Sequence, residues 1–487
     1  MTLLMLLEMI ASAFGDRLAI GTAAQGLTYQ DLYDRAGAGA EVLRRHGAQH
    51  LAYVGSSNEA FPVALFASAW AGVPFIPLNY RLGEEPLRAL LAAHDDVLVV
   101  ADDAALPLLA GAAATTLSID EWNEHTSQPC EPAASVTDGE DIAVLLYTSG
   151  TTAAPKAVVL RHRHLSSYVI GSVEFGAADD ADATLVSVPP YHIAGVANVL
   201  SNVYSARRLV YLPAFTAERW LDTVQGEGIT HAMVVPTMLA RVVDHLGAGV
   251  PAATPTLRSL AYGGARMPAT VLAAALQAFP ATDFVNAYGL TETSSTIAVL
   301  GPDDHRAARA GGSEEARARL ASVGRLVPGI EVDIRDGEIW VRGEQVSGEY
   351  LGQGGSLDAD GWFPTRDRGR VDDEGYLFIE GRSDDTIIRG GENIAPAEIE
   401  DVLLTHPAVK EAAVVGLPDD EWGQRLAAVV VLRGGLDADA EELRELVRAR
   451  LRTSKTPDLV VFRDELPHTE TGKLLRRTVL ADLTKEL

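Results

Sequence analysis

Short, continuous apolar runs alternate with helix-like stretches from the N-terminus to about Pro302. The runs lie at residues 97–101, 142–147, 185–188, 209–212 and 232–235. Strands that are apolar on both faces are typical of a sheet covered by helices on both sides. The alternation therefore predicts an α/β fold, in which large sheets are flanked by helices.

The pattern changes in the last third of the chain. Residues 322–379 contain short strand-like segments separated by glycine turns, for example at 332–335 and 338–341, which predicts a β-rich subdomain. Mixed helical and strand patterns follow Gly381 and Arg382. We therefore predict an N-terminal domain over residues 1–382 and a small α+β domain over residues 383–487, joined by a short charged turn that can serve as a hinge.

Charge and composition exclude several classes of protein. The formal net charge is −27, and so much negative charge repels nucleic-acid backbones and anionic membrane surfaces. The lone cysteine, Cys130, excludes an intramolecular disulfide and a cysteine-rich metal site, and it fits the cytoplasm. Residues 1–15 lack the early positive charge of a signal peptide, and prolines interrupt the longest apolar stretch, residues 60–78. We expect neither a signal peptide nor a membrane span.

A loop rich in hydroxyl groups lies between two apolar strand segments. Residues 147–156 read Tyr-Thr-Ser-Gly-Thr-Thr-Ala-Ala-Pro-Lys. Hydroxyl and backbone N–H groups on such a loop suit a polyphosphate, although a polar surface loop is the alternative. The spacing of a Walker loop is absent. The candidate phosphate-binding residues are Thr148, Ser149, Gly150, Thr151, Thr152 and Lys156.

This loop resembles the phosphate loop of the adenylate-forming (ANL) superfamily, which includes acyl-CoA synthetases, peptide-synthetase adenylation domains and luciferases. Further segments resemble the motifs of that family in the same order, at residues 286–293, 361–367, 381–385, 390–394 and 467–473. Each motif is weak alone, but the ordered set is specific. Only five of the 40 basic residues are lysines, and two of them, Lys156 and Lys473, fall where the family uses lysine.

The resemblance implies a site for Mg·ATP. It assigns Tyr288 to stacking on adenine, Thr291 to the α-phosphate, Glu292 to Mg²⁺, and Asp367 with Arg382 to the ribose. A carboxylate is a suitable hard ligand for magnesium. Ordinary alternatives are a core tyrosine, a solvated glutamate and a surface ion-pair cluster. The adenine edge is assigned to Gly264, Ala265, Asn286, Ala287 and Gly289.

The resemblance also implies that the C-terminal domain moves between two half-reactions. Lys473 would first bridge the substrate carboxylate and the α-phosphate, where a cation offsets their repulsion. The domain would then rotate about Asp384, so that Gly390 and Gly391 approach the pantetheine arm of coenzyme A. A solvated lysine is the alternative for Lys473.

Small residues dominate the segments that the resemblance assigns to the acyl pocket, and they favour a bulky apolar acid that is aryl, medium-chain or polycyclic. His192 would stand between this pocket and the thiol tunnel, although a structural histidine is the alternative. No aspartate accompanies His192, which argues against a free amino acid, whereas Arg241 leaves a malonate-type diacid open. The predicted pocket residues are His192, Ala194, Gly195, Val196, Tyr262 and Gly263.

We therefore expect an acid–CoA ligase that forms an acyl-adenylate from ATP and then a thioester, releasing pyrophosphate and AMP, as a monomer or homodimer. One alternative is an adenylation enzyme that loads a carrier protein. Another is a catalytically silent ligand-binding or scaffold protein. Ala153 and Ala157, which replace glycines that are usual in the family's loop, favour the silent alternative because alanine disfavours positive φ.

Overall fold

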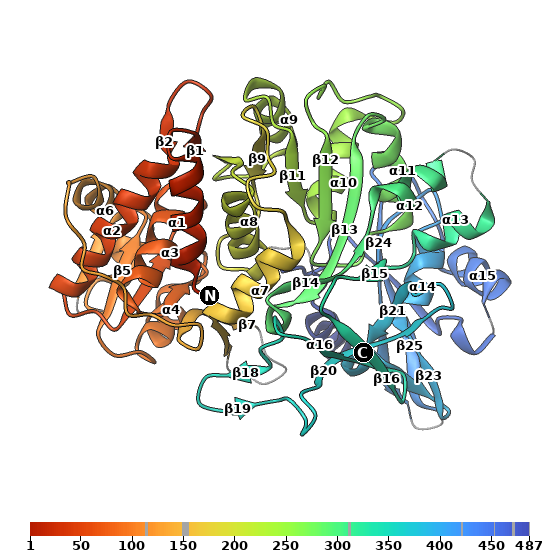
Figure 1. The fold of residues 1–487 in the computed structure, drawn as a ribbon. Helices are drawn as coiled ribbons and strands as arrows, with labels where there is room; N and C mark the ends of the chain where they lie inside the picture. The colour runs from red at the N-terminus through yellow and green to blue at the C-terminus, as the bar shows by residue number, and fades with distance from the viewer. Residues whose placement is uncertain are drawn as a thin grey trace.

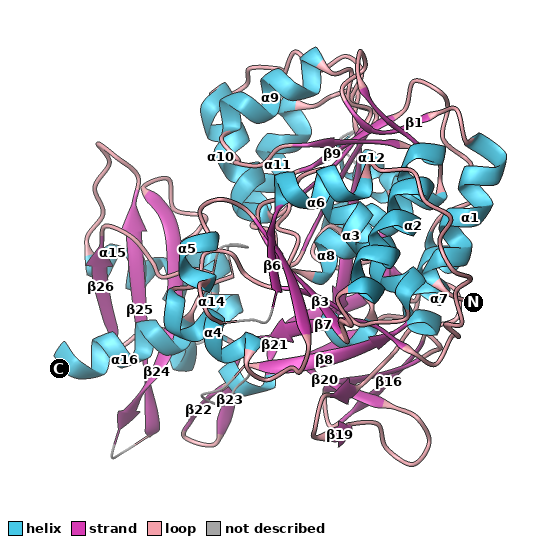
Figure 2. Cartoon of the chain, turned by 90° about the vertical axis from the view of Figure 1, so that its left-hand side faces the viewer, coloured by secondary structure: helices cyan, strands magenta, loops and turns pink. Residues whose placement is uncertain are grey.

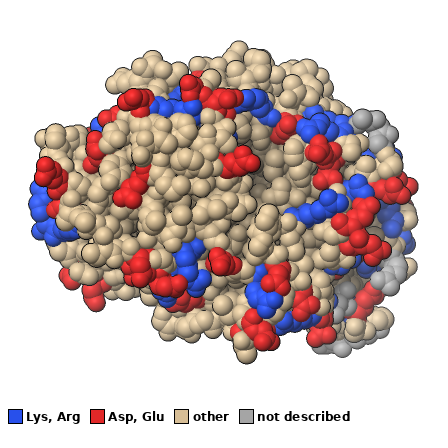
Figure 3. Space-filling model, viewed as in Figure 1, with Lys and Arg blue, Asp and Glu red and all other residues tan. Residues whose placement is uncertain are grey.

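Two large mixed sheets, together with the helices that cover them, make up most of the part of the chain that the structure describes (Figure 1). The computed structural model describes residues 1–112, 115–148, 155–309, 313–419, 422–451, 453–469 and 473–486. Among them, no helix is long and apolar enough to cross a membrane. Acidic and basic side chains are interspersed over the face seen in Figure 3, because many arginines pair with a neighbouring carboxylate.

Within these ranges, one sheet has eight strands in the order β19-β18-β8-β7-β4-β3-β5-β6. They are β3 (His50–Val54), β4 (Phe75–Pro77), β5 (Val97–Ala101), β6 (Thr115–Ser118), β7 (Ile142–Thr148), β8 (Lys156–Arg161), β18 (Glu349–Tyr350) and β19 (Gly354–Gly355). The strands from β6 to β7 in this order are parallel, whereas β8 and β18 are antiparallel to their neighbours. β7 and β8 flank the predicted phosphate loop.

A second sheet has nine described strands in the order β15-β14-β13-β12-β11-β9-β10-β1-β2. They are β1 (Leu18–Gly21), β2 (Gly26–Thr28), β9 (Ala183–Val186), β10 (Arg208–Tyr211), β11 (His231–Val234), β12 (Ser259–Gly263), β13 (Asp283–Leu290), β14 (Ser295–Leu300) and β15 (Arg325–Leu326). The neighbours from β1 to β13 in this order are parallel, so their carboxyl ends share one edge. That edge is where open α/β sheets bind ligands.

Helices cover both sheets, which confirms the predicted α/β class. They are α1 (Leu3–Phe14), α2 (Tyr29–Arg45), α3 (Ala60–Ala71), α4 (Glu84–Leu91), α5 (Leu106–Leu109), α6 (Ile119–Thr126), α7 (His162–Ser172), α8 (Ile193–Tyr204), α9 (Ala217–Gly226), α10 (Pro236–Leu246), α11 (Ala269–Ala278), α12 (Pro302–Arg309) and α13 (Glu314–Arg319). The apolar segment 60–78 forms the buried helix α3 followed by β4. The apolar side of α1 joins the same core through Leu3, Leu7 and Ile10.

The β-rich region confirms the change of pattern after residue 322, but its strands join two sheets. β16 (Glu331–Arg335), β17 (Glu338–Arg342), β20 (Phe363–Val371) and β21 (Leu377–Arg382) form an antiparallel sheet. Ile339, Phe363 and Leu377 of this sheet pack against Ile297 of β14. In contrast, β18 and β19 leave it and extend the eight-stranded sheet at β8. The local sequence pattern of a strand does not indicate which of these two sheets the strand joins.

The C-terminal region is mixed α+β, as predicted, and forms a block beside the large sheets (Figure 2). It contains β22 (Ile387–Arg389), β23 (Glu392–Ile394), β24 (Val409–Asp419), β25 (Gly423–Leu432), β26 (Leu459–Arg463), α14 (Pro396–Leu403), α15 (Ala440–Arg450) and α16 (Arg476–Glu486). Alternate residues of β24 and β25 face α14 and α15 on one side and α16 on the other. The domain boundary at Arg382 stays a prediction.

Candidate active site

The predicted adenine edge lies at the carboxyl ends of β12 and β13. Gly263 pairs with Ala287 across these parallel strands. A Cβ atom on Gly263 would stand 2.3 Å from the Ala287 carbonyl oxygen, so the strands approach this closely only because residue 263 is glycine. Gly264 follows directly after the end of β12 at a φ of +80°, a left-handed conformation that favours glycine. The structure therefore brings the segments around residues 264 and 287 side by side.

The predicted ribose ligands lie together beside this edge. The Tyr288 hydroxyl donates a 2.5 Å hydrogen bond to Asp367 Oδ2, and Arg382 Nη1 lies 3.1 Å from Oδ1 of the same carboxylate. Asp367 and Arg382 are direct partners in the pairing of β20 with β21. Burial raises the pKa of Asp367, and the Arg382 guanidinium opposes this rise. The site therefore holds a buried carboxylate in a fixed orientation.

Lys473 of the C-terminal region lies within electrostatic reach of this carboxylate. Its side chain remains exposed, but partial loss of water lowers the pKa of the ammonium group. The Arg382 guanidinium lowers this pKa further, whereas Asp367 and Asp385 act to raise it. The structure thus brings Lys473 near the Tyr288–Asp367 pair, although more than 100 residues separate Lys473 from Asp367 in the sequence.

Ion pairs lie within the C-terminal region, and one of the described pairs connects it to the rest of the chain. Arg476, at the start of α16, pairs with the buried Glu400 at 2.5 Å and with Asp385 at 3.5 Å. Arg266 pairs with Asp401 of α14. Because Arg266 directly follows the adenine edge, this pair connects the predicted nucleotide loop to the C-terminal region.

Glu292 lies in a 3₁₀ turn, η1 (Thr291–Thr293), between β13 and β14. Its Oε1 accepts a 2.8 Å hydrogen bond from the Tyr350 hydroxyl. The described residues contain no cluster of three or more His, Cys, Asp or Glu that could hold a metal. A lone carboxylate suits Mg²⁺, which takes most of its ligands from phosphate oxygens and water. The residues present therefore fit the predicted magnesium role.

Thr148 and Lys156 mark the two ends of the predicted phosphate loop and pair with each other across β7 and β8. Lys156 Nζ lies 5.6 Å from the centroid of the Tyr350 ring. Ala157 lies inside β8 and has no positive φ, so alanine introduces no strain there. The predicted residues Ser149, Gly150, Thr151 and Thr152, together with Ala153, lie outside the described residues.

His192 caps the N-terminus of α8, and its ring centroid lies 4.5 Å from that of Tyr191. Burial lowers the pKa of His192 to about 4, so its imidazole is neutral at physiological pH. Gly195 lies against the Pro189 carbonyl, which a Cβ atom would approach to 2.5 Å.

The other acyl-pocket candidates are mostly buried, and their assignment stays a prediction. Val196 is fully buried in the core, and the Tyr262 hydroxyl forms a 2.9 Å hydrogen bond with His305 Nε2 of α12. The Tyr262 side chain therefore packs between β12 and α12. Arg241, the candidate partner of a second carboxylate, is exposed on α10.

Gly390 and Gly391 form the turn between β22 and β23, with φ of +57° and +82°. The Gly390 N–H donates to the Trp422 carbonyl at 2.8 Å. An added Cβ on Gly391 would meet no atom within 4 Å. The turn is thus open at Gly391, as a site for a thin ligand requires, whereas a Cβ atom on Gly390 would lie 2.9 Å from the Trp422 ring.

Sequence reasoning missed Tyr350, Arg266 and Asp401. Each acts through a partner far away in the sequence, and none belongs to a motif identified from the sequence. Only their positions connect them with the predicted segments. Arg266 directly follows Gly264 and Ala265, Asp401 lies on α14, and Tyr350 lies in the β-rich region.

Known proteins resemble the chain over nearly its whole length. The AMP-binding enzyme family model matches residues 7–351, and that of the AMP-binding enzyme C-terminal domain matches residues 398–473. A 2-succinylbenzoate–CoA ligase of Bacillus cereus is 32% identical, over 97% of this chain and 96% of the relative. A fatty acid–[acyl-carrier-protein] ligase, ScoC of Streptomyces coeruleorubidus, is also 32% identical, over 93% and 90%.

Solved structures of similar proteins also match the chain over nearly its whole length. The o-succinylbenzoate coenzyme A synthetase of Bacillus subtilis, in complex with ATP and magnesium ion, matches with a TM-score of 0.84 and 27% identity over 98% of this chain and 99% of that one. ATP-bound MatB from Rhodopseudomonas palustris matches with a TM-score of 0.86 and 27% identity over 100% of both chains.

Proposed function

Because the chain belongs to the AMP-binding enzyme family, we propose that it is an ATP-dependent acid–CoA ligase that works through an acyl-adenylate. The observation that carries this proposal is that Lys473 lies within electrostatic range of Asp367 and Arg382, which are themselves paired. A catalytically silent relative would have no need to keep a partly desolvated ammonium group next to a ribose-binding carboxylate.

In the first half-reaction, this chain's residues hold and orient the reactants. The Gly264–Ala287 edge and Tyr288 bind adenine, Asp367 accepts from the ribose, and Lys156 and Thr291 bind phosphate oxygens. Lys473 lies between the acid and the α-phosphate and offsets the repulsion between these anions. The substrate carboxylate attacks the α-phosphorus, pyrophosphate leaves, and an acyl-adenylate remains. Magnesium held by Glu292 neutralises charge on the phosphates.

In the second half-reaction, the C-terminal region rotates about Asp384 and presents Gly390 and Gly391 to the pantetheine arm. The coenzyme A thiol attacks the acyl carbon, and AMP leaves. The open backbone at Gly391 and the position of Asp384 in a short 3₁₀ turn, η2 (Ser383–Asp385), support this step. In this proposal, Lys473 serves the first half-reaction and the glycine turn serves the second, each in its own orientation of the C-terminal region.

The acid is bulky and largely apolar, and an aryl acid is the best supported. The neutral imidazole of the half-buried His192 suits an apolar wall, and the Bacillus cereus relative is named for 2-succinylbenzoate, an aryl acid. The name of ScoC supports a carrier protein as an alternative acceptor. We place the enzyme in the cytoplasm, as a monomer or homodimer, and the exposed thiol of Cys130 fits a reducing compartment.

ATP–pyrophosphate exchange with a panel of aryl, medium-chain, polycyclic and dicarboxylic acids tests the proposal. We expect exchange with at least one bulky acid, followed by thioester formation with free coenzyme A. If a thioester forms only with a carrier protein that bears pantetheine, the acceptor is that carrier protein and not coenzyme A. Failure of every acid to support exchange would overturn the ligase assignment.

A further inference from the structure

Tyr350 contacts two predicted phosphate-handling groups that come from different parts of the chain. Its hydroxyl donates to Glu292 Oε1 at 2.8 Å, and Lys156 Nζ lies 5.6 Å from its ring centroid. The distance from Nζ to the ring lies within the range of a cation–π interaction. One side chain thus connects the candidate magnesium ligand with the candidate phosphate-loop lysine.

The backbone around Tyr350 is hydrogen-bonded to β8, the strand that follows the predicted phosphate loop. Tyr350 pairs with Val158 of β8, and the Leu351 N–H donates to the Ala157 carbonyl at 2.9 Å. We call residues 347–351 the clasp. Because the clasp is bonded to the same strand that begins with Lys156, Tyr350 keeps a fixed position relative to that lysine.

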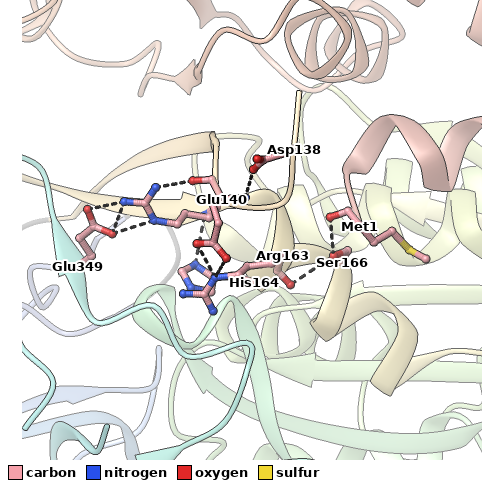
Figure 4. Close-up of polar contacts among 8 residues, drawn as sticks. Met1, Asp138, Glu140, Arg163, His164, Ser166 and Glu349 are labelled. Atoms are coloured by element: carbon pink, nitrogen blue, oxygen red, sulfur yellow. Dashed lines mark hydrogen bonds and ion pairs between the residues drawn. The ribbon is translucent and has the colours of Figure 1, made fainter. Parts of the chain in front are cut away.

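Side-chain contacts hold the clasp at both ends. The Glu349 carboxylate accepts hydrogen bonds from Arg161 of β8, with both oxygens 2.9 Å from Nη2 (Figure 4). At the other end, the Ser347 hydroxyl donates to the Val159 carbonyl, and the Ser347 N–H donates to the Glu292 carbonyl at 2.8 Å. The clasp therefore fixes the backbone as well as the side chain of Glu292.

The geometry of the Glu292 carboxylate suits metal binding. The Tyr350 hydroxyl engages Oε1 and thereby limits rotation of the carboxylate, while a carboxylate has further lone pairs to offer a cation. A ligand whose orientation is already fixed loses less entropy when the metal binds. This is the role that outer partners of metal ligands commonly have.

We propose that Tyr350 is a positioning residue that orients Glu292 toward Mg²⁺ through its hydroxyl and holds Lys156 at the phosphate loop through its ring. The inference rests on the proposed function, because it concerns how Mg·ATP is bound. It assigns two separable effects to two parts of one side chain, the hydroxyl and the ring.

Calorimetric titration with α,β-methylene-ATP, which cannot release pyrophosphate, separates these effects. Titrations with Mg²⁺ and with EDTA give the gain in affinity that magnesium provides. In Tyr350→Phe we expect this gain to fall roughly tenfold, because a hydrogen bond to a charged group is lost. Binding in EDTA should match the wild type, because the ring remains. Tyr350→Leu should bind more weakly in both titrations.

Tyr376→Phe is the matched control. The Tyr376 hydroxyl donates to Asp304 Oδ1 at 2.7 Å, so this variant removes a similar bond away from the site, and its magnesium gain should equal that of the wild type. An unchanged gain in Tyr350→Phe would overturn the inference. The inference would also be overturned if Tyr350→Phe reduced the magnesium gain just as much in a Glu292→Gln background. Tyr350 would then act without the Glu292 carboxylate. Wild-type protein that binds no analogue would instead contradict the proposed function.

Discussion

The Tyr288 hydroxyl donates a 2.5 Å hydrogen bond to Oδ2 of Asp367, the carboxylate whose Oδ1 lies 3.1 Å from Arg382. The adenine and ribose candidates are therefore directly bonded before any nucleotide binds. Since an ionised carboxylate offers about four lone-pair positions, Asp367 can accept ribose hydroxyls without losing either partner.

Replacing Tyr288 with phenylalanine tests this connection. The ring that would stack on adenine remains, but Asp367 loses one of the groups that orient it. We expect the KM for ATP to rise about three- to tenfold with a smaller change in kcat, because the affected group binds a part of the nucleotide that does not react. Asp367→Asn, which also weakens the pair with Arg382, should have the larger effect. A normal KM in Tyr288→Phe would show that Arg382 alone suffices to orient the carboxylate.

Removal of the Lys473 ammonium group should separate the half-reactions. In Lys473→Ala we expect acyl-adenylate formation to fall roughly hundredfold or more, since a preorganised charge is lost at the reaction centre. Thioester formation from supplied acyl-adenylate should largely survive. Lys455→Ala is the control, because Lys455 lies in the same C-terminal region but pairs with Glu398. Equal loss of both steps in Lys473→Ala would refute this division of labour.

Proline at position 384 should restrict the hinge. Asp384→Pro fixes φ at this position and should favour one orientation of the C-terminal region. We expect one half-reaction to slow far more than the other when each is measured alone. If both half-reactions kept their wild-type rates in this variant, the hinge would not be at residue 384.

The pair between Arg266 and Asp401 should stabilise the pose that the structure shows. Both side chains are about half exposed, so the pair contributes at most about 1 kcal/mol. We expect Arg266→Gln to slow acyl-adenylate formation by about two- to fivefold, and less so at high salt, while thioester formation from supplied acyl-adenylate changes little. The exchanged pair Arg266→Asp with Asp401→Arg should recover part of the loss. If the double variant formed acyl-adenylate no faster than the slower single variant, an attractive interaction between residues 266 and 401 would be excluded.

Two buried histidines predict loss of stability in acid. His162 and His164 are each 1% exposed, and burial lowers their pKa values to about 4 and about 3 from the usual 6.5. Between about pH 6.5 and these values, the unfolded chain binds protons that the folded chain does not. The free energy of unfolding should therefore decrease as the pH falls through this window.

Urea unfolding across this pH range measures the effect. The His162→Asn variant keeps an acceptor for the Leu3 N–H, which bonds to His162 Nδ1 at 3.2 Å, but it does not titrate. Its pH dependence should be weaker than that of the wild type. An identical slope would mean that His162 has the same pKa in both states.

The sequence predicted the sheets well, because they depend on local patterns; the nucleotide ligands, which also come from local motifs, stay a prediction. Buried parallel strands appear as continuous apolar runs, and residues such as Thr291 and Glu292 lie in one short motif. The contacts of Tyr350 and Arg161 could not be predicted in this way. Arg161 and Glu349 are 188 residues apart, and no local periodicity specifies which sheet a two-residue strand will join.

The position of β18 has a consequence for synthesis on the ribosome. The β7–β8 hairpin is complete once Arg161 has been translated, but its outer strand has no neighbour until residues 347–351 emerge. An open strand edge readily pairs with other chains. Truncated or stalled products that end before the clasp should therefore aggregate, and the nascent chain can acquire a complete nucleotide pocket only late in translation.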